Sequence, residues 1–404
     1  MPGILDGIKV LSWTVWQAGP NATATLGDLG AEIIKIEEPS RGDLMRWVWK
    51  ATPAPERQRE LPGGKSTIFE LCNRNTKSVT LDLSREPGRQ VLHRMVERCD
   101  VFVTNIHRAA KKWGLDYAGL SRDNPRLIYL LITGYGPKGP DWESGGYDPL
   151  GQARSGLMDA ISDPPLAPRG AILDQATSVM GSYGVVAALL ARERFGVGQE
   201  VNVSLVSTGI NLISNEMARI LLGGGESTRH DRARAFNPLR NLYRCADGRW
   251  IMGALTPADR YWPSFCQALG IVELEKDPRF ESNEVRGQHA EELISILDKV
   301  FASRTSDEWL ATFKGFPDLS FTGVNRCSEV ADDPQVVANN YLVDFSHPVL
   351  GEVKFPGFPI EFSETPAAIR SAAPDLGEHT REVLREMAGC GPEELDRLGG
   401  EGVI

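Results

Sequence analysis

The chain lacks the features that mark several large classes of protein. Its six cysteines include no C-x-x-C pair and its six histidines show no metal-ligand spacing, so we expect neither a bound metal nor a disulfide framework. No apolar run approaches the roughly 20 residues of a membrane helix. The N-terminus shows no basic segment followed by an apolar one, as a secretory signal would. We therefore expect a protein of the reducing cytoplasm with no membrane partner.

Positive charge is also scarce. Lys and Arg number 44 against 54 Asp and Glu, which gives a formal net charge of −10. An acidic chain without a basic tract argues against a nucleic-acid partner. Any polyanionic ligand must then be held by local cations and backbone N–H groups. A length of 404 residues exceeds one ordinary core and predicts two domains.

Strand and helix patterns alternate in the first half of the chain. Strand-like segments occupy residues 7–13, 32–37, 78–83, 100–105 and 126–133, with helical segments at 18–29 and 88–98 between them. This alternation predicts an α/β domain with a mostly parallel sheet, whose ligands bind in the loops after the strands.

A different pattern begins after Gly223-Gly224-Gly225, which we interpret as a linker because no Lys-Ser/Thr follows it. Residues 241–253 resemble a hairpin across the turn at Asp247-Gly248. Helical segments follow at 257–269, 284–302 and 306–314. This part predicts a smaller α+β domain, and the segment beyond about residue 335 is rich in proline and glycine.

Asp174 is the most informative single residue. It stands just before the small, apolar run of residues 178–194, which predicts a helix. A carboxylate at a helix entry meets free backbone N–H groups and the positive end of the helix dipole, which keep it ionised. Asp174 can therefore serve as a helix cap or as a nucleophile, and the local pattern alone does not decide between them.

Several blocks, in order and nearly over the full length, resemble the class III CoA-transferases, the family of formyl-CoA transferase and carnitine CoA-transferase. The blocks are residues 7–11, 17–20, 29–37, 42–43, 73–78, 100–105, 145–156, 237–239, 246–248 and 377–380. The resemblance implies a large Rossmann-like, CoA-binding domain that begins with residues 1–205 and is completed by 346–404. A small domain of residues 236–320 would lie between linkers at 206–235 and 321–345. The family's two chains interlock like links, which implies a homodimer, or a heteromer with a paralogue.

The resemblance also implies catalytic residues. Asp174 matches the family's catalytic carboxylate and stands ten residues before Gly184, as in the formyl-CoA transferase pattern. Gln17 matches a glutamine beside the reacting carbonyl, although a loop-ordering hydrogen bond would also explain it. Tyr147 matches a tyrosine near the active carboxylate, and its alternative is a core position.

Residues for binding CoA follow from the same resemblance. They are Val15, Trp16, Ala18, Arg41, Arg74, Lys77, Asn105, Ile106, Lys112 and Lys138. Asn105 is expected to flank the CoA tail and the cations to hold its phosphates, while a solvated surface position is the alternative for each cation. Glu38 stands where the family often has Arg or Pro, so Arg41 is expected to substitute. The loop before Trp113 is one residue short, which leaves Arg108 and Lys112 open.

The implied reaction moves CoA from an acyl-CoA donor such as succinyl-CoA to a carboxylic acid through an aspartyl anhydride and an aspartyl-CoA thioester. We expect an aryl or dicarboxylic acceptor, such as an arylsuccinate or an aryl-hydroxy acid. The aromatic residues of the second domain suggest a pocket for a bulky acyl group, and Arg240 suggests a partner for a second carboxylate. These aromatic residues are Tyr243, Trp250, Tyr261, Trp262 and Phe265.

Two alternatives remain open. A 2-methylacyl-CoA racemase would share the fold and the aspartate, but it needs a histidine where this chain has Tyr147 within Gly146-Tyr147-Asp148. Tyrosine is a poor proton shuttle near neutral pH. A catalytically silent subunit of a heteromeric transferase is the second alternative, and the intact Asp174 and Gln17 argue against it.

Overall fold

A computed structural model describes residues 2–47, 61–168, 170–225 and 230–404. The chain divides into two compact units, one of residues 1–225 with 339–404 and the other of residues 226–338. The larger unit carries a six-stranded parallel sheet and the smaller one a short antiparallel sheet, which confirms the predicted α/β class.

The large sheet has the strand order β3-β2-β1-β4-β5-β6. Its strands are β1 (Lys9–Trp13), β2 (Glu32–Glu37), β3 (Thr76–Thr80), β4 (Val101–Thr104), β5 (Ile128–Thr133) and β6 (Gln199–Ser204). The order reverses between β1 and β4, and the crevice at the carboxyl ends of two such strands is where α/β sheets bind ligands.

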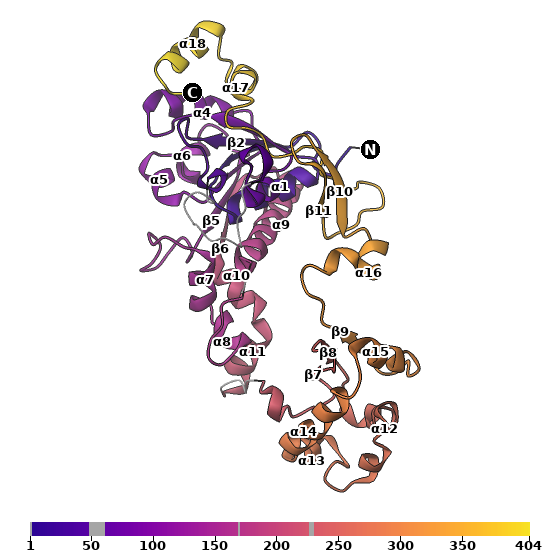
Figure 1. Ribbon diagram of the computed structural model, residues 1–404. Helices are drawn as coiled ribbons and strands as arrows, with labels where there is room; N and C mark the ends of the chain where they lie inside the picture. Colours follow the sequence, from indigo (N-terminus) through magenta and orange to yellow (C-terminus); the bar gives the residue numbers. More distant parts are fainter. Residues whose placement is uncertain (1, 48–60, 169, 226–229) are drawn as a thin grey trace. The chain divides into compact units, whose positions relative to one another are not determined.

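Alternate residues of the strands enter two separate cores. Val10 of β1 packs in the core that contains α1 (Ala18–Asp28) and α9 (Ile172–Phe195), two helices that lie side by side (Figure 1). Leu11 packs in the opposite core with α4 (Glu86–Val96). Successive side chains of a strand point to opposite faces, so apolar residues at both kinds of position produce a sheet covered on both sides.

Shorter elements complete the larger unit. They are α3 (Thr67–Cys72), α5 (His107–Lys112), α6 (Tyr117–Leu120), α7 (Asp148–Arg154), α8 (Leu157–Ile161), α10 (Leu205–Leu212), α11 (Ser214–Gly223), α17 (Thr380–Ala388), α18 (Pro392–Gly400) and the hairpin of β10 (Leu342–His347) and β11 (Gly351–Pro356). The C-terminal α17, drawn in yellow, packs on α4 (Figure 1). The end of the chain is therefore part of the larger unit.

Two segments differ from the sequence interpretation. Residues 206–223, which we placed in a linker, lie in α10 and α11 and belong to the larger unit, while residues 226–229 of that linker lie outside the described part. Ser204 and Ser207 cap α10 reciprocally, and Leu205 is buried, so this segment is held by its own cap and by packing. Helix α9 begins at Ile172 rather than near Ser178, which places Asp174 inside its first turn.

The smaller unit contains the predicted hairpin. Its strands are β7 (Leu242–Arg244), β8 (Trp250–Gly253) and β9 (Phe321–Gly323), with helices α12 (Ala258–Leu269), α13 (Asn283–Gln288), α14 (Ala290–Phe301), α15 (Ser306–Lys314) and α16 (Pro334–Ala338). The single helix expected at 284–302 is two helices that meet at His289.

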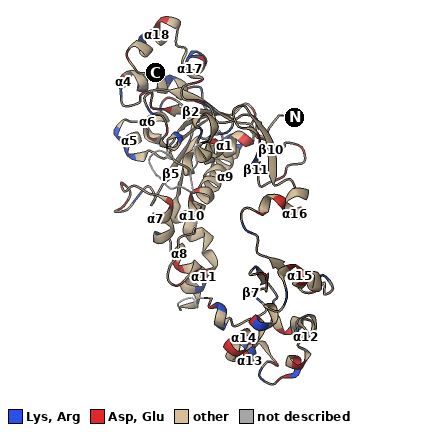
Figure 2. Cartoon of the chain, viewed as in Figure 1, with Lys and Arg blue, Asp and Glu red and all other residues tan. Residues whose placement is uncertain are grey.

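The core of the smaller unit is aromatic. Tyr243 stacks on Phe301 with ring centroids 4.4 Å apart, and both rings are buried with Trp262 and Phe265. The aromatic residues that suggested an acyl pocket are therefore mainly core residues. Lys and Arg are interspersed with Asp and Glu over each unit (Figure 2). Within the described ranges, no helix is long and apolar enough to cross a membrane.

Candidate active site

A cavity of about 1110 Å³ lies in the larger unit at the carboxyl ends of β1, β4 and β5. It is lined by residues 15–18, 105–109, 112–113, 132–134, 145–149, 167–168, 170–171, 174 and 205. The cavity occupies the point where the strand order reverses, and its volume suits a large ligand. It brings Asp174, Gln17 and Tyr147 together.

Asp174 faces this cavity from the first turn of α9. Its carboxylate receives no hydrogen bond from the described residues and is only partly buried. Burial, and then the charge of Asp148, raise the pKa of Asp174 from 3.8 to about 7. The helix entry was expected to keep this carboxyl ionised, but removal from water and a second carboxylate oppose the helix dipole and weaken that tendency.

The helix cap is supplied by Asp148, not by Asp174. Ala171, at the N-cap position, has φ 51° and offers no side-chain acceptor. Oδ2 of Asp148, from the first turn of α7, accepts the N–H groups of Leu173 at 2.7 Å and Asp174 at 2.9 Å. Because another residue caps α9, the side chain of Asp174 is left for the cavity.

The loop after β1 is fastened by side chains from other elements. Oδ1 of Asn105 accepts the N–H of Val15 at 3.0 Å, and Nδ2 of Asn105 donates to the Val15 carbonyl at 2.7 Å. Trp16 has φ 68°, a left-handed conformation that typically costs about 1–3 kcal/mol for such a residue. Its N–H donates to Oδ1 of Asp43 at 3.2 Å.

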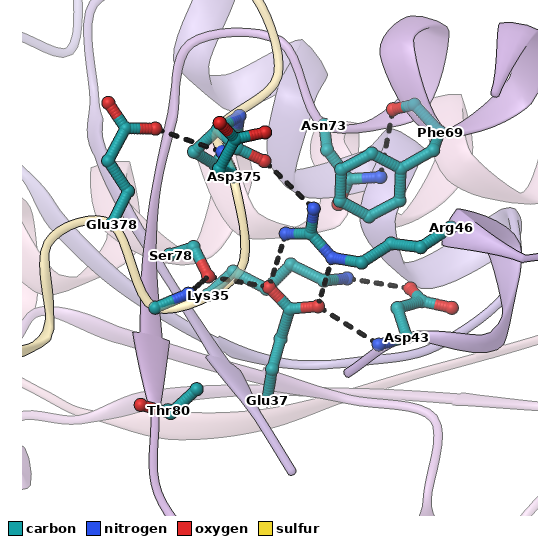
Figure 3. A network of polar contacts seen from close by, with 12 residues as sticks. Lys35, Glu37, Asp43, Arg46, Phe69, Asn73, Ser78, Thr80, Asp375 and Glu378 are labelled. Carbon is teal, nitrogen blue, oxygen red and sulfur yellow. Dashed lines mark hydrogen bonds and ion pairs between the residues drawn. The ribbon is translucent and has the colours of Figure 1, made fainter. Parts of the chain in front are cut away.

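A buried network of charges lies behind this loop (Figure 3). Glu37 accepts two hydrogen bonds from Arg46, at 2.9 and 2.8 Å, one from the Ser78 hydroxyl at 2.7 Å and one from the N–H of Asp43 at 2.9 Å. Burial alone would raise the pKa of Glu37, but the hydrogen bond from Arg46 and the charge of Lys35 outweigh it and lower the pKa to about 2. Arg46 also donates to the carbonyl of Pro374 at 2.9 Å, so the network includes the C-terminal segment.

Gln17 and Tyr147 are both available to a ligand. Gln17 precedes α1 without capping it, and no described residue hydrogen-bonds its side-chain amide. The loop is ordered by Asn105 and Asp43 instead, so the loop-ordering alternative for Gln17 is not what the structure shows. Tyr147 is 53% exposed, and its ring meets that of Trp16 edge to face at 5.7 Å, so it is not a core residue.

The expected CoA-binding residues fall into two groups. Val15, Trp16, Ala18, Asn105, Ile106 and Lys112 line the cavity, whereas Arg41, Arg74, Lys77 and Lys138 do not.

The cations outside the cavity are mostly occupied elsewhere. Arg74 is buried and donates from Nε to Asp28 at 3.0 Å, and Lys77 pairs with Glu32 at 3.0 Å. Arg41 is exposed beside Glu38. The guanidinium of Arg74 is already paired with a buried carboxylate, so the structure adds no support for Arg74 as a phosphate ligand.

Helix α5 supplies two polar lining residues outside the predicted set, His107 and Arg108, of which the sequence had left Arg108 open. Arg108 lies beside Lys112 on this helix, where blue residues are visible in Figure 2, and neither has an ion-pair partner within the described ranges. His107 also lines the cavity; burial lowers the pKa of its partly buried ring. Their place in the sequence could have indicated these residues, because α5 directly follows β4, the strand at which the strand order reverses. Nothing in the sequence indicated that Ala167 and Pro168 would also line the cavity.

The part of the chain that is described contains no cluster of three or more metal-ligating side chains.

Comparison with known proteins identifies the family. The model of CoA-transferase family III matches residues 5–380, and the chain belongs to this family. An acyl-CoA transferase of Fusarium pseudograminearum is 33% identical, covering 100% of this chain and 88% of its own. Succinyl-CoA:glutarate CoA-transferase of Mus musculus is 32% identical, covering 99% of this chain and 90% of its own. The crystal structure of a CAIB/BAIF family protein from Brucella suis has a TM-score of 0.83 at 30% identity and covers 96% of this chain and 100% of that chain.

These findings confirm the resemblance drawn from the sequence. The protein is a CoA-transferase, an enzyme that acts between acyl-CoA thioesters and carboxylic acids.

Proposed function

We propose that this enzyme transfers CoA from succinyl-CoA to a dicarboxylic acid, with Asp174 as the covalent nucleophile. The observation that carries the proposal is the carboxylate of Asp174, which faces the cavity with no hydrogen-bond partner in the described chain. Helix α9 is capped by Asp148, so capping does not explain why an aspartate stands at position 174. Gln17 and Tyr147 line the same cavity.

The reaction consists of four acyl transfers. The ionised Asp174 attacks the carbonyl of the donor thioester. The CoA thiolate departs, and a mixed anhydride forms between Asp174 and the donor acyl group. The thiolate attacks the aspartyl carbonyl and releases the donor acid, which leaves an aspartyl-CoA thioester. The acceptor carboxylate attacks this thioester to form a second anhydride and free the thiolate again. Attack of the thiolate on the acceptor's carbonyl then releases the new acyl-CoA and restores Asp174.

Neutral donors are suited to the oxyanions that form in each step. The Gln17 amide carries N–H groups without adding a charge, and no described residue competes for them. Loss of one such donor typically costs about a hundredfold or more in rate. The exposed hydroxyl of Tyr147 is a second donor at the same cavity.

The cavity also has groups suited to CoA. Arg108 and Lys112 project from α5 at its edge and supply positive charge for phosphates in an otherwise acidic protein. Both ends of the Asn105 amide are hydrogen-bonded to the backbone of Val15. We therefore propose that Asn105 affects binding of the CoA tail by holding the loop in shape, and not by a hydrogen bond of its own to CoA.

The choice of acceptor rests on the mouse relative, whose name gives succinyl-CoA and glutarate. Tyr243, Trp262 and Phe265 give the aryl alternative no support, because they are buried in the core of the smaller unit, whereas Trp250 is 37% exposed. Aryl acids stay in the acceptor screen as the competing outcome.

We also propose a homodimer. Val179, Tyr183 and Leu190 follow one another at helical spacing on α9 and are 51%, 68% and 58% exposed. An apolar stripe of this kind is typical of a surface covered by another chain. Sedimentation should give a dimer, and a stable, active monomer would refute this part of the proposal.

The decisive experiment is trapping of the aspartyl intermediates. The enzyme is incubated with a panel of acyl-CoAs, quenched in hydroxylamine and digested, and the peptide carrying Asp174 is weighed. We expect a hydroxamate with succinyl-CoA in the wild-type enzyme and none in Asp174→Asn. No label with any donor would refute the covalent mechanism. Because His107 lines the cavity, α-proton exchange of a 2-methylacyl-CoA in D₂O should be measured in parallel; exchange without label would indicate the racemase alternative.

A further inference from the structure

Lys35 and Asp43 form an ion pair beside the loop that carries Gln17, and neither belongs to the cavity lining. Their side-chain atoms Nζ and Oδ2 are 2.8 Å apart, and the two side chains are 1% and 0% exposed. Taking two charges out of water is unfavourable unless further contacts compensate for it. The other contacts of the pair therefore indicate what it does.

Each partner holds one peptide group of the loop after β1. Nζ of Lys35 donates to the carbonyl of Thr14 at 3.0 Å, and Oδ1 of Asp43 accepts the N–H of Trp16 at 3.2 Å. Asn105 takes both backbone groups of Val15, which lies between these two contacts. Three side chains from other elements thus fix the backbone from Thr14 to Trp16 before any ligand is present (Figure 3 shows Lys35 and Asp43).

The fastening matters most at Trp16. A tryptophan at φ 68° is unfavourable by itself and persists only where its surroundings impose the conformation. The next residue, Gln17, lies at the N-cap position of α1, and the ring of Trp16 rests against Tyr147. A change in the backbone of Trp16 would therefore move two of the groups that line the cavity.

We propose that Asp43, held in place by Lys35, is a positioning residue that fixes Trp16 in its left-handed conformation and so aims Gln17 into the cavity. The inference rests on the proposed function, because it assigns the aim of Gln17 a role in the transfer reaction. Asp43 acts through Trp16 and does not contact the ligand itself.

The charges can be separated from the hydrogen bond by mutation. Asp43 uses Oδ1 for the N–H groups of Trp16 and Met45 and Oδ2 for Lys35. Asparagine retains the first oxygen, but its amide N–H₂ would face the ammonium of Lys35. Both variants of Asp43 are therefore made together with Lys35→Met, so that no charge is left unpaired in the buried site.

The test compares Lys35→Met/Asp43→Asn with Lys35→Met/Asp43→Ala. The two proteins lack the same ion pair and differ in whether residue 43 offers an acceptor to the N–H groups of Trp16 and Met45. We expect kcat of the alanine variant to be about a hundredfold below that of the asparagine variant, because small misplacements of reacting groups have effects of this size. The rate of Asp174 hydroxamate formation in a single turnover should fall in parallel, while KM for the acyl-CoA changes little.

Arg192→Met is the matched control. Arg192 forms a largely buried pair with Asp100, just before β4 and so at the end of the sheet away from the cavity. Its loss should lower stability and leave kcat and the trapping rate close to wild type. Equal kcat in the two double variants would overturn the proposal.

Hydrogen exchange of the wild-type enzyme provides a measurement that does not depend on the variants folding. The Trp16 amide should exchange far more slowly than an unstructured peptide, and its protection should disappear in the alanine variant while β1 stays protected. A Trp16 amide that exchanges freely in the wild type overturns the inference. Absence of an Asp174 hydroxamate in the wild type would instead remove the proposed mechanism and leave the fastening of the loop intact.

Discussion

Replacing Asp174 by asparagine should stabilise the protein at alkaline pH although it removes the proposed nucleophile. In the folded state burial and Asp148 raise the pKa of this carboxyl from 3.8 to about 7. A carboxyl that holds its proton more tightly when folded favours folding at low pH, and this contribution is lost as the pH rises through the folded pKa. Asparagine does not ionise, so the variant avoids the loss.

The size of the effect follows from the shift. A change from 3.8 to about 7 corresponds to about 4 kcal/mol once the pH is above the folded pKa. Between about pH 5 and about pH 8 the stability difference between variant and wild type should grow by about 2–3 kcal/mol. For the roughly 300 residues of the larger unit this corresponds to about 4 °C in Tm.

Thermal unfolding of both proteins across this pH range measures the difference. Asp318→Asn, at an exposed position in the smaller unit, controls for the change in net charge and should not follow the same profile. A stability difference that stays constant with pH, or that shrinks towards alkaline pH, would show that Asp174 is not held in the environment described.

Three further changes probe the site and its support. Asp148→Asn should move the limb of the kcat/KM profile that rises with pH to lower pH, because it removes the charge of Asp148, one of the two causes of the raised pKa of Asp174. An unchanged midpoint would contradict this. Lys112→Ala should raise KM for acyl-CoA about tenfold, or about 1.4 kcal/mol, less so at high salt, whereas Lys138→Ala, outside the cavity, should not. Glu37→Gln should lower the free energy of urea unfolding by about 3 kcal/mol at neutral pH, since it leaves buried cations without their partner. The folded pKa of Glu37 is about 2, so its contribution is present above the unfolded value of 4.5 and should disappear as the pH falls from 4.5 through 2.

The fold could be read from the sequence where the pattern is local. The strand expected at residues 32–37 is β2, and the hairpin expected at 241–253 is β7 with β8. The start of α9 could not be found in this way, because its cap comes from Asp148, which is 25 and 26 positions from the two N–H groups that it accepts. Helices α10 and α11 were missed because an apolar stretch before a glycine run was interpreted as a linker.

The same contrast between local patterns and contacts distant in sequence applies to the site. Resemblance of motifs indicated Asp174, Gln17 and Tyr147, and the structure places all three at one cavity. The cations proposed for the CoA phosphates were harder to choose, because a sequence shows that an arginine follows a strand but not which carboxylate it meets. Arg74 pairs with Asp28, 46 positions away, whereas Arg108 on α5 has no ion-pair partner among the described residues.

The return of the chain to the larger unit has a consequence for biosynthesis. Arg46 is bonded to Pro374, 328 positions later, and Ser78 to Gly377, 299 positions later. At about 5–20 residues per second, a ribosome needs roughly 15–65 s to make the chain between Arg46 and Pro374. During that time the loop that carries Gln17 exists without the segment that completes the charge network behind it. The nascent larger unit is therefore incomplete until the segment with Pro374 and Gly377 emerges, and a stop codon near residue 370 should impair the loop that carries Gln17 as much as a mutation within it.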